Sequence, residues 1–293
     1  MRIVATRRLP GPAWDELPDV DVLPLADAGD AEVLIVANER LDLDRLPALR
    51  LVANYGVGYD QIDVAACRAR GIAVTNTPDV LDAATADLAM ALALAARRRL
   101  VEGDRLVRSG GWETPWSSGP FLGRDVSGAT LGIVGLGRIG SAVARRARAF
   151  DMRVVHHRRT RDGDDWRPLD DLLREADVVS LHMPLSPETT GLISRERLAL
   201  LRDGATLVNT ARGAIVDEDA LVDELVSGRI NAGLDVFVHE PHVPRALLDL
   251  PNVVLAPHIG SATVETRAAM TRVVVDNVLA LVRGAPLVTP VAG

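Results

Sequence analysis

The 293-residue sequence contains no lysine and a single cysteine. Its 33 strongly basic residues are therefore all arginine, which excludes Schiff-base chemistry through a lysine side chain, pyridoxal phosphate enzymes included. Cys67 has no partner for an internal disulfide, which is typical of a chain in a reducing compartment, and we expect a cytoplasmic protein. We do not expect Cys67 to be a catalytic thiol.

Long hydrophobic runs and net positive charge are also missing. No apolar stretch is long enough to span a bilayer, and residues 1–6 enter a short predicted strand without a signal-peptide pattern. The formal net charge of -7 and the isoelectric point near 5.4 argue against a nucleic-acid-binding surface. At this length, with 48% hydrophobic residues, we expect two medium-sized domains that bind neither nucleic acid nor membrane.

The most informative feature that is present is a glycine motif in residues 130–140, T-L-G-I-V-G-L-G-R-I-G. Gly135, Gly137 and Gly140 follow an apolar run in G-x-G-x-x-G spacing, and apolar residues then recur at helical spacing. The pattern predicts a strand, a tight turn and a helix, with a second strand at 153–157. Glycine lets the backbone approach a pyrophosphate, and the helix N-terminus offers unpaired N–H groups to its charge. We therefore predict a dinucleotide cofactor.

The residues after the second strand indicate which dinucleotide is bound. A carboxylate there would accept hydrogen bonds from the adenine-side ribose of NAD and repel the 2′-phosphate of NADP. This chain has Arg158, Arg159 and Thr160 instead. Guanidinium–phosphate hydrogen bonds of about 1.5–3 kcal/mol each would favour NADP(H) by roughly ten- to a few hundred-fold, with NAD(H) as the second option. The alternative interpretation is a solvated basic turn, since Arg161 follows.

Short apolar strands alternate with helical stretches, which predicts an α/β fold. We expect two Rossmann-like domains: a dinucleotide-binding domain with a doubly wound parallel sheet at 97–261, and a smaller flavodoxin-like substrate domain formed by 1–96 and 262–293. A helix at 82–100 bridges the two, and a helix at 264–283 follows the last strand. The predicted strands are 2–5, 33–37, 51–54, 72–75, 130–134, 153–157, 178–181, 206–209, 232–235 and 253–256.

The segment 110–128 is rich in glycine, serine and proline and contains Trp112 and Trp116. We expect this segment to form a surface arm or a contact between subunits.

Three polar residues, Arg212, Glu240 and His258, each come a few residues after a predicted strand. Because open α/β sheets bind ligands at the carboxyl ends of their strands, we expect all three at one ligand-binding edge. An arginine there can hold a substrate carboxylate with two parallel hydrogen bonds and polarise a carbonyl oxygen. Taken singly, each residue also has a structural interpretation, as a loop ion pair or a packing residue.

Six sequence blocks together resemble the D-isomer-specific 2-hydroxyacid dehydrogenases, and within them the NADPH-preferring glyoxylate/hydroxypyruvate reductases. The resemblance covers nearly the whole chain. The blocks are A-N-Y-G-V-G-Y-D-Q-I-D at 53–63, N-T-P-D-V-L-D-A-A-T-A-D-L-A at 76–89, L-G-R-D-V-S-G-A-T-L-G-I-V-G-L-G-R-I-G at 122–140, L-V-N-T-A-R-G-A-I-V-D at 207–217, A-G-L-D-V-F-V-H-E-P at 232–241 and V-V-L-A-P-H-I-G-S at 253–261.

The resemblance implies a homodimeric NAD(P)-dependent oxidoreductase that transfers a hydride to glyoxylate, hydroxypyruvate or another small 2-oxo acid, giving a D-2-hydroxy acid. It implies catalysis by Arg212, Glu240 and His258. Substrate binding would involve Val57 and Gly58 beside Arg212 and His258, and Asp235 would orient the nicotinamide carboxamide. The cofactor-binding residues that the resemblance implies are Gly135, Gly137, Arg138, Ile139, Gly140, Arg158, Arg159, Thr160, Pro184, Thr189, Thr210, Asp235, His258 and Gly260.

The roles of the three catalytic residues then follow from the chemistry. The alkoxide that forms on hydride transfer needs a proton near neutral pH, and His258 is the natural donor. A nearby carboxylate, Glu240, would favour the imidazolium and so keep His258 protonated before the proton is transferred. Arg212 would fix the 2-oxo acid by its carboxylate and so aim its carbonyl at the hydride. Closure of two domains on the cofactor would expel water.

Metal binding is not expected. His239 and His242 flank Glu240, but the segment has no compact set of three ligands, and hydride transfer needs no metal. His182 begins a loop that borders the cofactor in the family.

Two departures from the family pattern stand out. The region before Ala53 is short, so we expect one helix of the small domain to be reduced or missing, which affects the outer wall of the substrate pocket. Asp151 stands where glycine is common, at an expected left-handed position that aspartate tolerates better than most residues.

Several alternatives stay open. The same mechanism could serve D-glycerate or a bulkier D-2-hydroxy acid. A formate dehydrogenase is disfavoured, because that group has glutamine in place of Glu240. A non-catalytic, cofactor-gated binding protein is a further alternative, since the family includes transcriptional corepressors.

Overall fold

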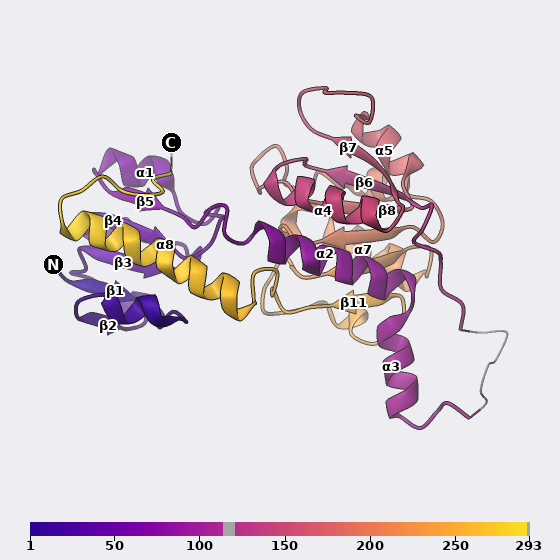
Figure 1. Cartoon of the computed structure of the whole chain (residues 1–293), viewed down its shortest axis with the longest axis horizontal. Coiled ribbons are helices and arrows are strands. Elements are labelled where there is room, and N and C mark those ends of the chain that lie inside the picture. The colour runs from indigo at the N-terminus through magenta and orange to yellow at the C-terminus, as the bar shows by residue number, and fades with distance from the viewer. Residues whose placement is uncertain (114–120, 292–293) are drawn as a thin grey trace. The chain divides into compact units, whose positions relative to one another are not determined.

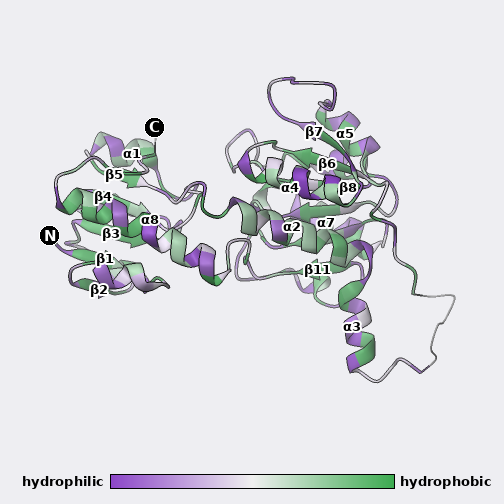
Figure 2. Ribbon diagram, viewed as in Figure 1, coloured by the Kyte–Doolittle hydropathy of each residue, from purple (hydrophilic) through white to green (hydrophobic). Residues whose placement is uncertain are grey.

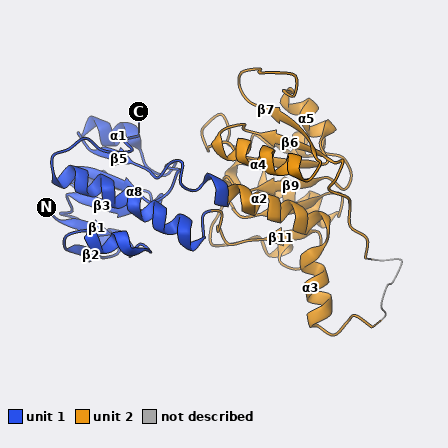
Figure 3. Cartoon of the chain, viewed as in Figure 1, with its two compact units in different colours: residues 1–84, 261–293 blue, residues 85–260 orange. Residues whose placement is uncertain are grey.

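The computed structural model describes residues 1–113 and 121–291, and it divides the chain into two compact units (Figure 3). Unit 1 contains residues 1–84 and 261–293, and unit 2 contains residues 85–260. Trp116, in the expected surface arm, lies outside the described residues. Within the described ranges, no helix is both long enough and apolar enough to cross a membrane.

Unit 1 is built on a five-stranded parallel sheet in the order β2-β1-β3-β4-β5, which is the flavodoxin-like order. Its strands are β1 (Ile3–Ala5), β2 (Val20–Val22), β3 (Val33–Val36), β4 (Leu51–Asn54) and β5 (Ala73–Thr75), and its α-helices are α1 (Val64–Ala69) and α8 (Val264–Val282). The sequence did not indicate β2, because two of its three residues are exposed and it carries no continuous apolar run.

The connections before β4 contain no α-helix in the described chain. The chain forms the 3-10 helices η1 (Pro12–Glu16), η2 (Leu25–Asp27) and η3 (Leu43–Arg45) between β1 and β4. The 19-residue helix α8 packs against η1 and β4 and covers this face of the sheet (Figure 1). Its approach is close, because a Cβ added at Gly11 would lie 2.9 Å from the Cβ of Ala268.

Unit 2 contains a six-stranded parallel sheet in the order β11-β10-β9-β8-β6-β7. The chain starts at β6, adds β7 on one side and the remaining strands on the other, so the sheet is doubly wound as predicted. The elements are α2 (Asp82–Arg97), α3 (Leu100–Arg108), β6 (Thr130–Val134), α4 (Arg138–Ala149), β7 (Arg153–His157), α5 (Leu169–Glu175), β8 (Val178–Leu181), α6 (Arg195–Leu198), β9 (Thr206–Asn209), η4 (Gly213–Ile215), α7 (Glu218–Val226), β10 (Asn231–Leu234), η5 (Arg245–Leu247) and β11 (Val253–Leu255).

The central strands of this sheet are mostly hydrophobic (Figure 2), as a helix-covered parallel sheet requires. Every residue of β6, β8 and β9 is buried. Helix α5 packs directly on β6, because Gly132 has no side chain and an added Cβ would lie 2.5 Å from Leu172 Cδ2. The sheet is therefore the rigid core from which the loops of the candidate site project.

The first boundary between the units differs from the one expected. The structure places it between Ala84 and Thr85, within helix α2, instead of after residue 96. The reason is packing: Ala86, Ala89 and Ala93 of α2 belong to the same hydrophobic cluster as the β6 side chains. The bridging helix also ends earlier than residue 100, because Arg99 adopts a left-handed conformation (φ 52°) and separates α2 from α3. The second boundary lies after Gly260.

Asp151 has a φ of 57°, so the expected left-handed conformation in the turn between α4 and β7 is confirmed.

Candidate active site

The glycine motif forms a tight turn between β6 and α4. Gly135 has a φ of 99°, and a Cβ there would lie 2.7 Å from the carbonyl carbon of His182. A Cβ on Gly140 would collide with the carbonyl oxygen of Gly135. Gly137 is different, since an added Cβ would have no neighbour among the described residues within 4 Å. Two of the glycines are thus required by packing, and the third leaves the backbone open to a ligand.

The surroundings of this turn fit a dinucleotide. Helix α4 begins at Arg138, and its N-cap residue Gly137 makes no side-chain cap, which is the type of helix N-terminus that binds a pyrophosphate in dinucleotide-binding proteins. After β9, the buried hydroxyl of Thr210 has no hydrogen-bond partner in the part of the chain that is described. A buried unpaired hydroxyl is costly, and a cofactor hydrogen bond would satisfy it.

Arginine occupies the position after β7 where a carboxylate would contact the adenine-side ribose. The Arg158 side chain is about half exposed, and its Nη1 donates to Asp162 Oδ2 at 3.0 Å. Arg159 and Thr160 are exposed beside it. The basic group therefore lies at the sheet edge where the sequence predicted it, and an acidic residue that the sequence analysis did not single out accompanies it.

The loop after β8 carries Pro184 and Thr189. The Thr189 hydroxyl donates to the Pro184 carbonyl at 2.8 Å and accepts from the Ser186 N–H at 2.8 Å, which closes the loop on itself. His182, which begins this loop, has its pKa lowered by desolvation to about 4. Its imidazole is therefore neutral at pH 7 and bonds Ser180 Oγ through Nε2 at 2.8 Å.

His258 and Glu240 form a hydrogen-bonded pair. His258 Nδ1 lies 2.7 Å from Glu240 Oε2, although 18 residues separate them in the sequence. The other carboxylate oxygen of Glu240 accepts the Phe237 N–H at 3.0 Å. Partial burial by itself would raise the pKa of Glu240, but the hydrogen bonds from His258 and Phe237, and the charges of His258 and Arg212, lower it overall. Glu240 is therefore an ionised partner for the imidazole.

Asp235 holds the turn that carries His258. Its carboxylate is fully buried and accepts the N–H groups of Ile259 at 2.7 Å and Gly260 at 2.8 Å. Its carbonyl oxygen accepts the His258 N–H at 2.9 Å. Desolvation raises the pKa of Asp235 above its ordinary range. This anchoring keeps His258 in a left-handed conformation (φ 53°) that non-glycine residues rarely adopt.

Arg212 follows β9 in extended backbone, immediately before η4. The Asn209 side chain donates to the Arg212 carbonyl at 2.9 Å and accepts the Ala211 N–H at 3.0 Å. These two hydrogen bonds fix the backbone that follows β9 and carries Arg212. A Cβ on Gly213 would collide with the Phe237 backbone, which brings the segments of Arg212 and Glu240 into direct contact. The sequence analysis did not single out Asn209 and Gly213, since an asparagine or glycine at a strand end is common in any turn.

Val57 and Gly58 lie in unit 1, in the turn after β4. The Asn76 side chain donates to the Val57 carbonyl at 2.9 Å, and the Asn54 side chain donates to the Gly58 carbonyl at 2.8 Å. These contacts fix the carbonyl groups of the turn. Tyr55 donates its hydroxyl to the Arg267 carbonyl at 3.0 Å and stabilises the packing of α8.

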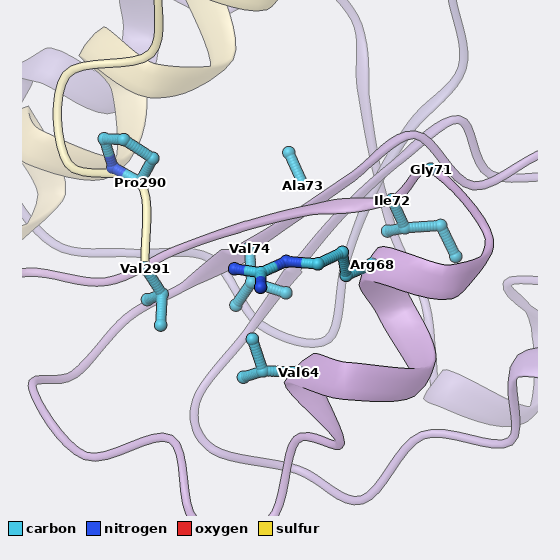
Figure 4. Close-up of a pocket in the computed structure, with 8 residues that line it drawn as sticks. All are labelled: Val64, Arg68, Gly71, Ile72, Ala73, Val74, Pro290 and Val291. Carbon is cyan, nitrogen blue, oxygen red and sulfur yellow. The ribbon is translucent and has the colours of Figure 1, made fainter. Parts of the chain in front are cut away.

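A pocket of about 240 Å³ also lies in unit 1, between α1, β5 and the segment that ends the described chain (Figure 4). It forms because residues 290–291 run along the edge of β5, with the Val291 N–H bonded to the Val74 carbonyl at 2.8 Å. Arg68 is its one charged lining residue, and none of the predicted site residues lines it. The described ranges contain no group of three or more His, Cys, Asp or Glu side chains arranged to hold a metal.

Comparison with known proteins identifies the chain. The model of the D-isomer specific 2-hydroxyacid dehydrogenase NAD binding domain matches residues 90–260, which is more than half of the sequence and nearly all of unit 2. The chain belongs to the D-isomer specific 2-hydroxyacid dehydrogenase family. It is therefore an oxidoreductase, and unit 2 is its nicotinamide dinucleotide-binding domain.

Similar proteins match almost the whole chain. A glyoxylate reductase of Pyrococcus horikoshii is 50% identical over 283 residues, which are 92% of this chain and 84% of that enzyme. A crystal structure of a Thermus thermophilus protein has a TM-score of 0.94 at 48% identity and covers 100% of both chains. The NADPH-dependent glyoxylate/hydroxypyruvate reductase of Sinorhizobium meliloti, solved with NADP and malonate, has a TM-score of 0.88 at 39% identity, with 99% of this chain and 96% of that chain covered.

The lowered pKa of Glu240 predicts a pH-dependent contribution to stability. Since the native pKa is below the ordinary value of 4.5, ionised Glu240 stabilises the fold above that pH, and the contribution is lost as the pH falls through the native pKa. We expect Glu240→Gln to lower the free energy of unfolding by a constant amount at neutral pH and by a shrinking amount below pH 4.5. Denaturant titrations at a series of pH values measure this difference.

The matched control is the same substitution in a His258→Ala background. Because the hydrogen bond from His258 is the largest cause that lowers the Glu240 pKa, the pH dependence should be reduced there. An equal pH dependence in both backgrounds would contradict the assignment.

Proposed function

We propose that this chain uses NADPH to reduce small 2-oxo acids, glyoxylate and hydroxypyruvate among them, to D-2-hydroxy acids. The observation that carries the proposal is the 2.7 Å hydrogen bond between His258 and Glu240 at the ligand-binding edge of a dinucleotide-binding sheet. The chain is also half identical to a glyoxylate reductase over nearly its full length, which supports the choice of substrate.

His258 is the proton donor in this proposal. When bound, the dihydronicotinamide supplies the hydride. Because Nδ1 of His258 faces Glu240, Nε2 is the nitrogen that gives a proton to the developing alkoxide. Glu240 stays ionised and stabilises the charged imidazole before the proton is given. The imidazole is about half exposed, so it can be reprotonated from solvent.

Arg212 binds the substrate carboxylate, for which its planar guanidinium is better suited than a point charge. Its position next to the Glu240 segment supports this role, since a 2-oxo acid held there presents its carbonyl to His258. Val57 and Gly58 offer their backbone N–H groups to a carboxylate. Asn76 and Asn54 hold the carbonyls of that turn, which supports the role.

The cofactor assignment divides the edge of unit 2 into three parts. The turn and first helical residues, Gly135, Gly137, Arg138, Ile139 and Gly140, bind the pyrophosphate. The adenine-side ribose and its 2′-phosphate meet Arg158, Arg159 and Thr160. The nicotinamide side is lined by Pro184, Thr189, Thr210, Asp235, His258 and Gly260. The substrate domain is unit 1. Arginine in place of a carboxylate after β7 supports the preference for NADPH, as does the NADPH dependence of the Sinorhizobium meliloti relative.

A homodimer is part of the proposal. Helix α3 has no buried residue, and hydrophobic and hydrophilic segments alternate along it (Figure 2). Leu100 and Val107 of this helix, with Trp112 and Leu122 beyond it, are each more than half exposed. Exposed apolar side chains gathered around one helix support contact with a second copy of the chain.

The substrate prediction is tested by initial rates with NADPH and NADH on glyoxylate, hydroxypyruvate, pyruvate and a bulkier 2-oxo acid. We expect the highest kcat/KM with NADPH and the two small acids. In the His258→Ala variant kcat should fall about 100- to 10,000-fold because the proton donor is lost, while NADPH binding should be largely retained, because the pyrophosphate and 2′-phosphate contacts are unchanged. His239→Ala is the matched control, since that exposed histidine lies next to Glu240 outside the pair. Binding of NADPH without turnover of any acid would contradict the proposal.

The cofactor prediction concerns Arg158. Replacing Arg158 by aspartate removes a phosphate ligand and adds a repelling charge, so the ratio of kcat/KM for NADPH over NADH should fall by roughly ten- to a few hundred-fold. Arg161→Asp makes the same change in charge three residues later, where the guanidinium lies over the Trp166 ring, and should have a much smaller effect. An unchanged ratio in Arg158→Asp would remove this residue from phosphate binding.

The dimer prediction is tested by light scattering after size-exclusion chromatography. The wild-type protein should have twice the 31.3 kDa mass of the chain, and Val107→Glu should give monomer at the same concentration, because a charge would be buried in the interface. Val226→Glu is the matched control: it is 56% exposed, like Val107 at 57%, but lies on α7. Equal masses for both variants would contradict the interface.

A further inference from the structure

The arginine proposed to bind the 2′-phosphate already has an anionic partner in its own loop. Arg158 Nη1 donates to Asp162 Oδ2 at 3.0 Å, and the other oxygen of Asp162 accepts from His156 Nε2 at 2.8 Å. The His156 side chain is only 9% exposed, whereas Arg158 and Asp162 are 47% and 42% exposed. Asp162 therefore bridges a buried histidine and a solvent-facing arginine.

The loop that carries Asp162 is fastened to β7 and its continuation. Trp166 donates its indole N–H to the Arg158 carbonyl at 3.0 Å, and the N–H groups of His156 and Arg167 bond to the carbonyls of Asp165 and His156 at 2.9 and 2.8 Å. The hydrogen bond from His156 is the largest cause that lowers the pKa of Asp162, so this carboxylate is ionised at neutral pH. A fixed negative charge thus lies beside the Arg158 guanidinium.

We propose that Asp162 is a specificity-determining residue that competes with the cofactor 2′-phosphate for Arg158 and so limits the preference for NADPH over NADH. This inference rests on the proposed function of Arg158. Arg158 occupies the position where NAD-binding domains usually have an acidic residue. Asp162, four residues later in the chain, places a carboxylate beside that arginine.

The effect follows from the charges. A phosphate monoester carries a charge of about -1.5 to -2 at neutral pH, so the carboxylate repels it and also occupies one edge of the guanidinium. The 2′-hydroxyl of NADH is neutral, so the carboxylate of Asp162 does not repel it, and its binding does not depend on the guanidinium of Arg158. Both side chains are more than a third exposed, which limits the coupling to that of a solvent-screened pair, equivalent to about 1.5- to fivefold in binding.

The test is direct measurement of the Kd for NADPH and for NADH by calorimetry, which needs no turnover. In Asp162→Asn, an isosteric change that keeps an acceptor for His156, the Kd for NADPH should fall about 1.5- to fivefold at low salt while the Kd for NADH is unchanged. High salt should diminish the gain. Asp164→Asn is the matched control, because it removes the same charge from the same loop, and Asp164 accepts the Arg167 hydrogen bond through its backbone carbonyl, which the substitution keeps. It should leave both Kd values unchanged.

An Arg158→Ala background separates the possible failures. In the Arg158→Ala background, Asp162→Asn should no longer lower the Kd for NADPH, because the guanidinium for which Asp162 and the phosphate compete is absent. If Arg158→Ala itself leaves NADPH binding unchanged, the proposed cofactor assignment fails. If Arg158→Ala weakens NADPH binding but Asp162→Asn does not strengthen it, only the role of Asp162 is overturned. Weaker NADPH binding in Asp162→Asn also overturns it, since the carboxylate would then support the arginine instead of competing for it.

Discussion

The candidate site depends on one constraint: all six strands of unit 2 run in the same direction. Parallel pairing from β7 to β11 brings their carboxyl ends to one edge, so Gly135, Arg158, Thr210, Asp235 and His258 project from that edge although they are far apart in the sequence. Because the central strands are buried on both faces, a slip in register would displace a whole face of packed side chains. The core thereby fixes the geometry of the loops.

Two carboxylates near His258 have opposite pKa shifts because their surroundings differ. Asp235 is fully buried, and desolvation raises its pKa even though two N–H groups donate to it. Glu240 is partly exposed, and its hydrogen bonds outweigh desolvation, so its pKa is lowered. The first holds the backbone of the histidine turn, and the second holds the imidazole itself. Separate anchors for backbone and side chain restrict the orientation of His258 more than either would alone.

Arginine is the only strong base in this chain, and its charges at the ligand edge are balanced locally. Asp162 pairs with Arg158, and the charge of Arg212 lowers the pKa of Glu240. A guanidinium keeps its charge at any physiological pH and offers five N–H groups, so a local carboxylate and an incoming anion compete for the same donors. In our proposal, the preference for NADPH depends on competition between Asp162 and the 2′-phosphate for the guanidinium of Arg158.

The sequence by itself determined the fold class, the glycine turn, ten of the eleven strands in the described part of the chain, and the three polar residues after β9, β10 and β11, because apolar periodicity and glycine spacing are local properties of the chain. It did not determine β2, which is short and exposed, or the unit boundary inside α2, which depends on the surface that the helix covers. Tertiary structure alone decided that Asp235 anchors the His258 turn and that Asp162 faces Arg158. Those contacts join groups brought together by strand pairing and loop closure, and no sequence spacing encodes their distance.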